Sequence, residues 1–305
     1  MASQKDVKSR ISSVKNIHKI TRAMEMVAAA RLRRAEERIA NLRPYAQAIR
    51  KMTQQVADAS EGAADIPLLA GRETIKKVGI ALVTGDRGLA GSFNTQIIRE
   101  GLRLKREYES EGAEVVYSVV GRRGNSTFSF RGEDVQHSYV GFTDRPSFTD
   151  AREISRDLTS AYADEELDRV DLVYNRYVSP LTQYVRRQTL LPLQKAEVFG
   201  EAIPEPEEPA DPDLVEGHER AYWYYEPDPE LLLPKLFEEY VDLSVYRALL
   251  ESAASEHGAR MTAMRSAAEN AGEIIDDLTL EMNRARQAEI TQEILEVVGG
   301  AEALG

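Results

Sequence analysis

The chain has 305 residues, a mass of 34.1 kDa and a net charge of −12, with 42% hydrophobic residues and no cysteine. Without cysteine it can form neither disulfides nor thiolate metal sites, and its four histidines are too scattered to make a metal-binding motif. No run of about 18 apolar residues could span a membrane, and the polar N-terminus lacks the pattern of a signal or transit peptide, so we expect a soluble intracellular protein.

Residues 1–60 are predicted to form one long helix. Positions 9–60 contain no glycine and one proline, Pro44, at which we expect a kink. Apolar residues recur mostly at steps of three, four or seven, which indicates a helix that packs along one seam. The predicted seam comprises Val7, Ile11, Val14, Ile17, Met24, Val27, Ala35, Ile39, Leu42, Ile49, Met52 and Val56.

The same segment is strongly basic, with 13 Lys and Arg residues against 5 acidic residues in positions 1–60. A basic helix could bind nucleic acid or a lipid surface. Its charges surround the helix, however, and no aromatic side chains alternate with them as single-stranded nucleic acid would favour. We therefore favour basic patches that face an acidic protein partner.

Residues 75–199 have the alternating pattern of an α/β domain. Short apolar runs predict buried strands and the segments between them predict helices, so we expect a mainly parallel, Rossmann-like sheet. Strands are predicted at 78–84, 114–120 and 170–178, an antiparallel edge strand at 182–191, and helices at 92–109 and 147–163.

A glycine-rich turn at 84–94 joins the first predicted strand to the first predicted helix. Backbone N–H groups in such a turn can bind phosphate. The turn lacks the lysine of a P-loop and the GxGxxG pattern of dinucleotide sites. We therefore favour a tight turn and close packing as the role of Gly85, Gly88 and Gly91 over nucleotide binding.

Residues 200–217 are rich in proline and glutamate, and we predict an acidic loop there. Positions 197–230 hold 12 acidic residues against a single arginine. An aromatic cluster at 222–225 follows, with the only tryptophan, Trp223. It fits a core or a docking surface equally well.

Residues 230–305 are predicted to form a second long helix. From Leu250 to Ala285 the seam positions alternate four and three steps without interruption over eleven positions, which is a heptad pattern. Many of these positions are alanine, so a partner helix can approach closely. Because each terminal helix needs a partner, we predict a long antiparallel coiled coil of the two chain ends with the α/β domain at one end.

Several long motifs of the chain resemble the gamma subunit family of F-type ATP synthase. They cover most of the chain in the family's order, at 11–39, 85–91, 225–229, 256–271 and 283–301. The resemblance implies a central stalk whose terminal helices form a coiled coil inside a ring of three alpha and three beta subunits. The α/β domain would form a foot on the ring of membrane c subunits beside the epsilon subunit.

The resemblance further implies a non-catalytic rotor subunit that couples proton flow through the c ring to ATP synthesis on beta. It implies no catalytic, cofactor-binding or metal-binding residue in this chain. It also implies a peripheral position on the cytoplasmic side of the cell membrane.

Contact residues are assigned by the same resemblance. Arg286 and Gln287 match the family's pair that hydrogen-bonds a loop of beta, and Met24 matches a methionine near an acidic segment of beta. Trp223 and Tyr225 match aromatic contacts of the foot with the c ring and epsilon. Further contacts with beta are expected at Lys8, Arg31, Arg33 and Arg34.

Two other classes of protein remain open from the residues alone. One is a nucleotide-dependent enzyme built on the α/β domain, which should bind ATP or NAD. The other is a coiled-coil scaffold unrelated to an ATPase, which need not purify with an ATPase head.

Overall fold

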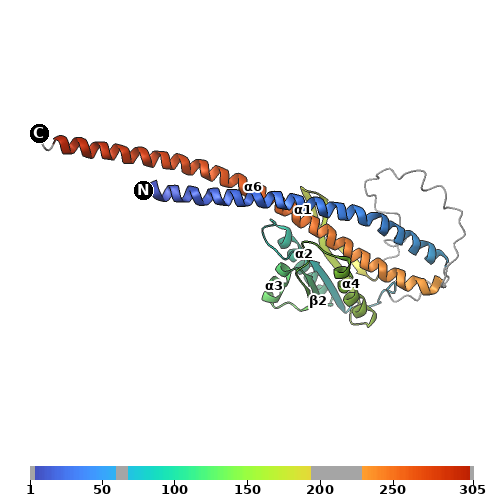
Figure 1. Ribbon diagram of the computed structural model, residues 1–305. Helices are drawn as coiled ribbons and strands as arrows, with labels where there is room; N and C mark the ends of the chain where they lie inside the picture. The colour runs from blue at the N-terminus through green and yellow to red at the C-terminus, as the bar shows by residue number, and fades with distance from the viewer. Residues whose placement is uncertain (1–3, 60–67, 194–228, 303–305) are drawn as a thin grey trace, which may run out of the picture.

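The structure, a computed structural model, describes residues 4–59, 68–193 and 229–302 (Figure 1). Two long helices, α1 (Gln4–Ala59) and α6 (Pro229–Glu302), run antiparallel and form a shaft. An α/β domain, the foot, lies against the shaft, and the C-terminal end of α6 projects beyond the start of α1. This is the predicted fold class. The predicted loop at 200–217 and residues Trp223 and Tyr225 lie outside the described residues.

The seam predicted for α6 is confirmed. All eleven positions that follow the four–three alternation from Leu250 to Ala285 are buried or half-buried. From Arg286 to Gly299 every residue is exposed. The coiled coil therefore ends near Ala285, and α6 continues as a single helix.

The seam of α1 differs from the predicted one, because Ile17, Val27 and Met52 are exposed and Met24 is only half-buried. The residues of α1 that face α6 instead follow one another at strictly alternating steps of four and three, and several of them are polar. These buried or half-buried residues are Val7, Ile11, Val14, His18, Thr21, Glu25, Ala28, Leu32, Ala35, Ile39, Leu42, Ala46, Ile49, Thr53 and Val56.

Contacts with α6 explain how α1 accommodates two locally unfavourable residues, Glu25 in the seam and Pro44 within the helix. Glu25 is tolerated in the seam because Arg265 of α6 donates to its carboxylate at 3.0 Å. Pro44 lies inside α1 without ending it, and the neighbouring Tyr45 hydroxyl donates to Glu239 of α6 at 3.1 Å. Packing along the whole seam thus offsets the local cost of a proline in a helix, which is about 3 kcal/mol.

The foot is built on a five-stranded sheet in the order β3-β2-β1-β4-β5. The first four of these strands run parallel, and β5 pairs antiparallel with β4 at the edge. The strands are β1 (Lys77–Val83), β2 (Glu114–Val120), β3 (Val135–Tyr139), β4 (Arg169–Ser179) and β5 (Thr182–Leu191). The four strands predicted from the sequence are confirmed with small shifts at their ends.

Helices cover both faces of this sheet. The core on one face holds residues of α2 (Phe93–Ser110) and α3 (Arg122–Arg131). The core on the other face holds residues of α4 (Phe148–Ala163) and of the first half of α6, including the fully buried Phe237. Because burying one large apolar side chain contributes about 1.5–3 kcal/mol, α6 is part of the foot's core as well as half of the shaft.

Helix α3 and strand β3 were not predicted. The α3 sequence RRGNSTFSFR buries only Gly124 and Phe128, so it carries almost no apolar periodicity. Strand β3 has five residues, of which Tyr139 alone is fully buried. Elements this short are fixed by packing on the sheet rather than by their own pattern.

Candidate functional site: the junction of shaft and foot

The glycine-rich turn lies at the place where an α/β sheet usually binds its ligand. Strand β1 is central, with β2 on one side and β4 on the other, so the chain order reverses at its carboxyl end. Open parallel sheets bind ligands in the crevice at such a switch point. Residues 84–91 follow β1 directly and border this crevice.

In this protein, helix α6 fills the crevice. A Cβ atom on Gly85 would lie 2.7 Å from Glu256 Oε2, so the helix touches the turn. Arg260 donates to Glu256 at 2.5 Å and to the Gly88 carbonyl at 3.2 Å. The remaining cavity, between Thr84, Thr143 and α6, measures about 10 Å³, near the lower limit for one water molecule.

The first two N–H groups of the turn, which could otherwise receive a phosphate, are already engaged. Gly85 N donates to Asn94 Oδ1 at 2.8 Å, and Asp86 N donates to Thr143 Oγ1 at 2.9 Å. The Asp86 carboxylate accepts from the backbone N–H groups of Arg122 at 3.0 Å and Gly141 at 2.9 Å. The turn is therefore fastened within the foot and packs against α6, and the close approach predicted for Gly85 is confirmed.

The part of α6 in the crevice carries buried ionisable groups. Glu256 and His257 are almost fully buried, and Arg260 is nearly so. Burial raises the pKa of Glu256 even though Arg260 opposes this shift. Burial lowers the pKa of His257 to about 4, and its Nε2 lies 3.3 Å from the Asp144 carbonyl oxygen. At neutral pH His257 is thus an uncharged imidazole held between shaft and foot.

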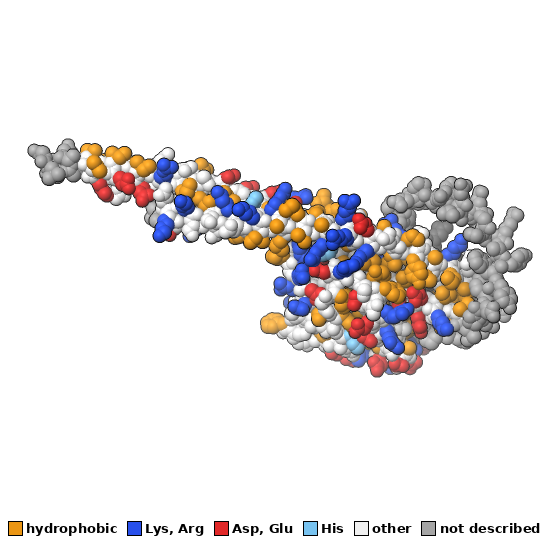
Figure 2. Space-filling model, in the orientation of Figure 1, with side chains coloured by type: hydrophobic (Ala, Val, Ile, Leu, Met, Phe, Trp, Pro, Cys, Tyr) orange, Lys and Arg blue, Asp and Glu red, His pale blue; other side chains and the backbone are white. Residues whose placement is uncertain are grey.

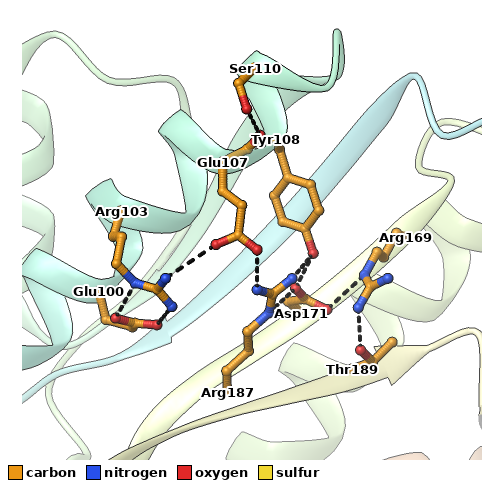
Figure 3. Close-up of polar contacts among 9 residues, drawn as sticks. All are labelled: Glu100, Arg103, Glu107, Tyr108, Ser110, Arg169, Asp171, Arg187 and Thr189. Atoms are coloured by element: carbon orange, nitrogen blue, oxygen red, sulfur yellow. Dashed lines mark hydrogen bonds and ion pairs between the residues drawn. The ribbon is translucent and has the colours of Figure 1, made fainter.

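A second polar cluster lies inside the foot and ties α2 to the edge of the sheet (Figure 3). Asp171 of β4 is fully buried and accepts from Arg169 Nε at 3.0 Å and Arg187 Nε at 2.9 Å. The Tyr108 hydroxyl also donates to Asp171, and burial raises the pKa of Tyr108. Arg187 Nη1 also donates to Glu107 Oε1 of α2 at 2.8 Å. Every charge in this cluster has a partner, which is the condition for burying a carboxylate.

The contact residues predicted on α1 do not form one pocket but follow the helix. Lys8 and Arg34 are exposed, and Met24 is half-buried beside the seam. The Arg33 side chain is 84% exposed and lies 3.7 Å from Glu37 of its own helix. Arg31 differs, because Arg31 Nη1 donates to Asp144 Oδ2 in the foot at 2.6 Å.

Arg286 and Gln287 lie at the start of the single-helix end of α6, which we call the tip (residues 286–302). Both are exposed. The tip also exposes several large apolar side chains, beside which the described residues place no second helix, and Figure 2 shows hydrophobic side chains along its visible face. They are Ile290, Ile294, Leu295, Val297 and Val298.

Sequence reasoning missed the groups that join shaft and foot: Asp144, Glu256 and Arg260. Asp144 and Glu256 are more than 100 positions apart, so no local pattern connects them. One signal was present. Glu256 and Arg260 are charged residues four apart that flank the seam position His257 in the buried half of α6.

In the described part of the chain, no helix is long and apolar enough to cross a bilayer. Among the same residues, no group of three or more His, Asp or Glu side chains could hold a metal ion. Fold and junction together define the class: a two-helix shaft joined to an α/β foot whose ligand crevice is filled by the shaft itself.

Comparison with known proteins identifies the particular family. A family model described as ATP synthase matches residues 3–304. The ATP synthase gamma chain of Rubrobacter xylanophilus is 46% identical over 304 residues, which cover 100% of this chain and 99% of the relative. That of Heliobacterium modesticaldum is 43% identical over 307 residues, which cover 100% of both. The chain therefore belongs to the ATP synthase gamma chain family.

Solved structures give the same picture of the fold. A chain in the central stalk and c-ring structure of Tetrahymena thermophila mitochondrial ATP synthase has a TM-score of 0.57 and 30% identity, over 81% of this chain and 99% of that one. A chain in the Euglena gracilis mitochondrial ATP synthase has a TM-score of 0.65 and 17% identity, over 99% and 94%. The second likeness concerns the fold alone.

Proposed function

We propose that this chain is the rotor in the central stalk of an ATP synthase and carries rotation of a c ring to the catalytic beta subunits. The observation that carries the proposal is the tip of α6. Its 17 residues extend beyond the end of the coiled coil and expose apolar side chains such as Ile294 and Leu295. An isolated helix of this length is marginal in water, and exposed apolar surface of this kind marks a contact with another protein.

The shaft surface supports the same proposal. Ile17, Ile20, Met26 and Val27 are exposed on α1, off the seam. Lys and Arg side chains surround them, and Figure 2 shows both kinds mixed along the visible face of the shaft. A ring of alpha and beta subunits around this part of the shaft would cover the apolar side chains. Exposed basic groups could attract acidic segments of beta without locking to them, because exposed ion pairs contribute only about 0–1 kcal/mol.

The mechanism follows from the asymmetry of a single shaft among three equivalent partners. The shaft presents a different face to each beta subunit, so its contacts stabilise a different conformation in each. As the shaft turns, every subunit passes through the same conformations in sequence. Arg286 and Gln287 at the base of the tip, and Met24 with Lys8, Arg31, Arg33 and Arg34 on α1, are the proposed contacts with beta.

The chain itself is proposed to be a non-catalytic subunit of the enzyme complex. Supporting this, α6 fills the crevice where a ligand of an α/β sheet would lie, and the turn after β1 donates to Asn94 and Thr143. Trp223 and Tyr225 are proposed contacts of the foot with the c ring and epsilon. Through these partners the chain would be held peripherally at the cytoplasmic side of the cell membrane.

Rotation can be tested directly, because the chain has no cysteine and any introduced one is unique. The Phe130→Cys variant places a thiol on a side chain of the foot that is 92% exposed. The thiol is coupled to a linker before the variant is assembled with alpha and beta, so that no other subunit is labelled, and the bead is attached to the linker once the head is fixed to a glass surface. ATP should drive rotation of the bead in one direction. A head that hydrolyses ATP around a bound but stationary chain would contradict the rotor function.

The two other classes give different results in simpler measurements. A nucleotide-dependent enzyme should release or absorb heat when ATP or NAD is titrated into the isolated chain, whereas the rotor should not. A scaffold unrelated to an ATPase need not purify from native membranes together with an ATPase head. The rotor should do so in a fixed ratio to alpha and beta.

A further inference from the structure

Two side chains of α1 reach past the seam to the foot, one on each side. Arg31 directly precedes the seam residue Leu32, and Glu36 directly follows the seam residue Ala35. These are the two heptad positions that flank a seam. Arg31 Nη1 donates to Asp144 Oδ2 at 2.6 Å, and Glu36 accepts a hydrogen bond from the Tyr177 hydroxyl.

Helix α6 runs between these two contacts. Asp144 lies in the connection from β3 to α4, whereas Tyr177 lies near the end of β4. Ala254 of α6 packs against Leu32 and Ala35, with Tyr177 at the edge of the same cluster. The foot thus holds α1 through two polar groups that stand on either side of α6.

The foot groups are themselves held in place. Asp144 Oδ2 also lies 3.2 Å from Arg87 Nη1 of the glycine-rich turn, and its backbone carbonyl lies 3.3 Å from His257 Nε2. The Tyr177 side chain is half-buried, and burial raises its pKa, so the hydroxyl remains a donor at neutral pH. Both contacts therefore join α1 to fixed points of the foot.

The apolar cluster in the seam beside these contacts is small and includes alanine on both helices. The local cluster is built from Ala35 and Leu32 of α1 and Ala254 of α6, with Ile39 and Met261 packed against it. Alanine side chains are short, so they interlock less deeply than leucine would. Helix α6 is fastened by the foot's apolar core, with Phe237 among its fully buried residues. At the level of Leu32, the α6 residue buried against α1 is a single alanine, Ala254.

We propose that the pairs Arg31–Asp144 and Glu36–Tyr177 form a two-sided brace that stops α1 from rolling on α6, so that both helices turn with the foot as one body. This inference rests on the rotor function proposed above. It gives Arg31 and Glu36 a positioning role inside the chain.

The brace can be broken from the foot alone, which leaves the outer surface of the shaft unchanged. The variant combines Asp144→Asn with Tyr177→Phe, two changes that keep side-chain size. The matched control combines Asp134→Asn with Tyr184→Phe. Neither control residue bonds to a shaft helix among the residues that the structure describes. Each pair is introduced into the Phe130→Cys chain and assembled with the head for bead attachment.

The measured quantity is the angular variance of the bead while the head is stopped by a non-hydrolysable ATP analogue. Variance rises as the torsional stiffness between head and foot falls. Losing one hydrogen bond to a charged group raises the population of displaced states by about tenfold. The brace variant should therefore show a clearly larger variance than the parent, while the control should match the parent.

Three results are distinguishable. A larger variance in the brace variant alone supports the brace. An unchanged variance, with normal ATP-driven rotation of the parent bead, overturns the brace and leaves the rotor function standing. A parent bead that never rotates overturns both. If the double variant fails to assemble, Tyr177→Phe alone, which removes one hydroxyl and keeps the packed ring, is scored in the same way.

Discussion

The two ends of α6 share a helical conformation but differ in burial and in the contacts of their side chains. From Leu233 to Arg260 most residues are buried against the foot and α1, and the buried Glu256 and Arg260 are paired while His257 is uncharged at neutral pH. From Arg286 to Gly299 every residue is exposed. One continuous helix thus begins in the core of a domain and ends as a solvent-exposed surface.

This difference separates stability from function along a single helix. Extending an existing helix adds one hydrogen bond for each residue fixed, so the tip can grow from the buried half without a nucleus of its own. Substitutions in the buried half should therefore change the free energy of unfolding of the isolated chain. Substitutions in the tip should change only the behaviour of the assembled complex.

The largest effect is expected at Phe237, which is fully buried in the core shared by α6 and the foot. Phe237→Ala should lower the free energy of unfolding of the isolated chain by about 3–5 kcal/mol, because it removes a ring and leaves a cavity. Urea unfolding followed by circular dichroism measures this. The matched change in the tip is Leu295→Ala, at a side chain that is 66% exposed. Its free energy of unfolding should stay within about 0.5 kcal/mol of that of the parent. A similar loss of stability in both variants would contradict the separation of a stabilising buried half from an exposed tip.

The two helices of the shaft also show how much of the coiled-coil seam could be predicted from the sequence. The seam of α6 could be predicted because its apolar and small residues alternate without a break from Leu250 to Ala285. On α1 the apolar residues Ile17 and Val27 suggested the wrong face. The true seam there passes through Thr21 and Glu25, and Arg265 on the partner helix makes the carboxylate acceptable. A partner's charge cannot be read from the pattern of one helix.

The contacts at the junction of shaft and foot could not be predicted for a similar reason. The alternation of strands and helices predicted the sheet, and the glycine-rich turn was correctly placed after the first strand. What fills the crevice depends on Glu256 and Arg260, far along the chain. Arg31 was assigned only a partner contact, since nothing in the sequence connects it with Asp144. The polar residues of the candidate site thus depend on tertiary contacts, whereas the elements that carry them depend on local periodicity.

A second test of the buried half uses pH. The pKa of His257 is lowered to about 4 in the folded protein, against about 6.5 in an unfolded chain. Below pH 6.5 the unfolded chain binds a proton that the folded protein does not, so stability falls as the pH is lowered towards 4. The full difference corresponds to about 3 kcal/mol.

The variant His257→Gln should remove this part of the pH dependence, so its free energy of unfolding should fall less than that of the parent between pH 6.5 and 4. Glu256, whose raised pKa acts in the opposite direction, is present in both proteins, and its contribution cancels in the comparison. Arg260, Asp144 and Arg31 also act on the imidazole and are likewise unchanged. His137→Gln, at a partly exposed position of β3, is the control. Equal slopes for the parent and His257→Gln would contradict burial as the cause.

The smallest effect on stability is expected where the proposed effect on function is clear. The double variant Arg286→Ala, Gln287→Ala changes two exposed side chains at the base of the tip. The isolated chain should keep its free energy of unfolding within about 0.5 kcal/mol, whereas ATP synthesis by the assembled complex in vesicles should fall. Asp276→Ala with Asp277→Ala alters a similarly exposed pair beside the coiled coil and should synthesise ATP as the parent does. Undiminished synthesis by the first variant would remove Arg286 and Gln287 from the contacts with beta, and the functional surface of the tip would then have to lie among its apolar side chains.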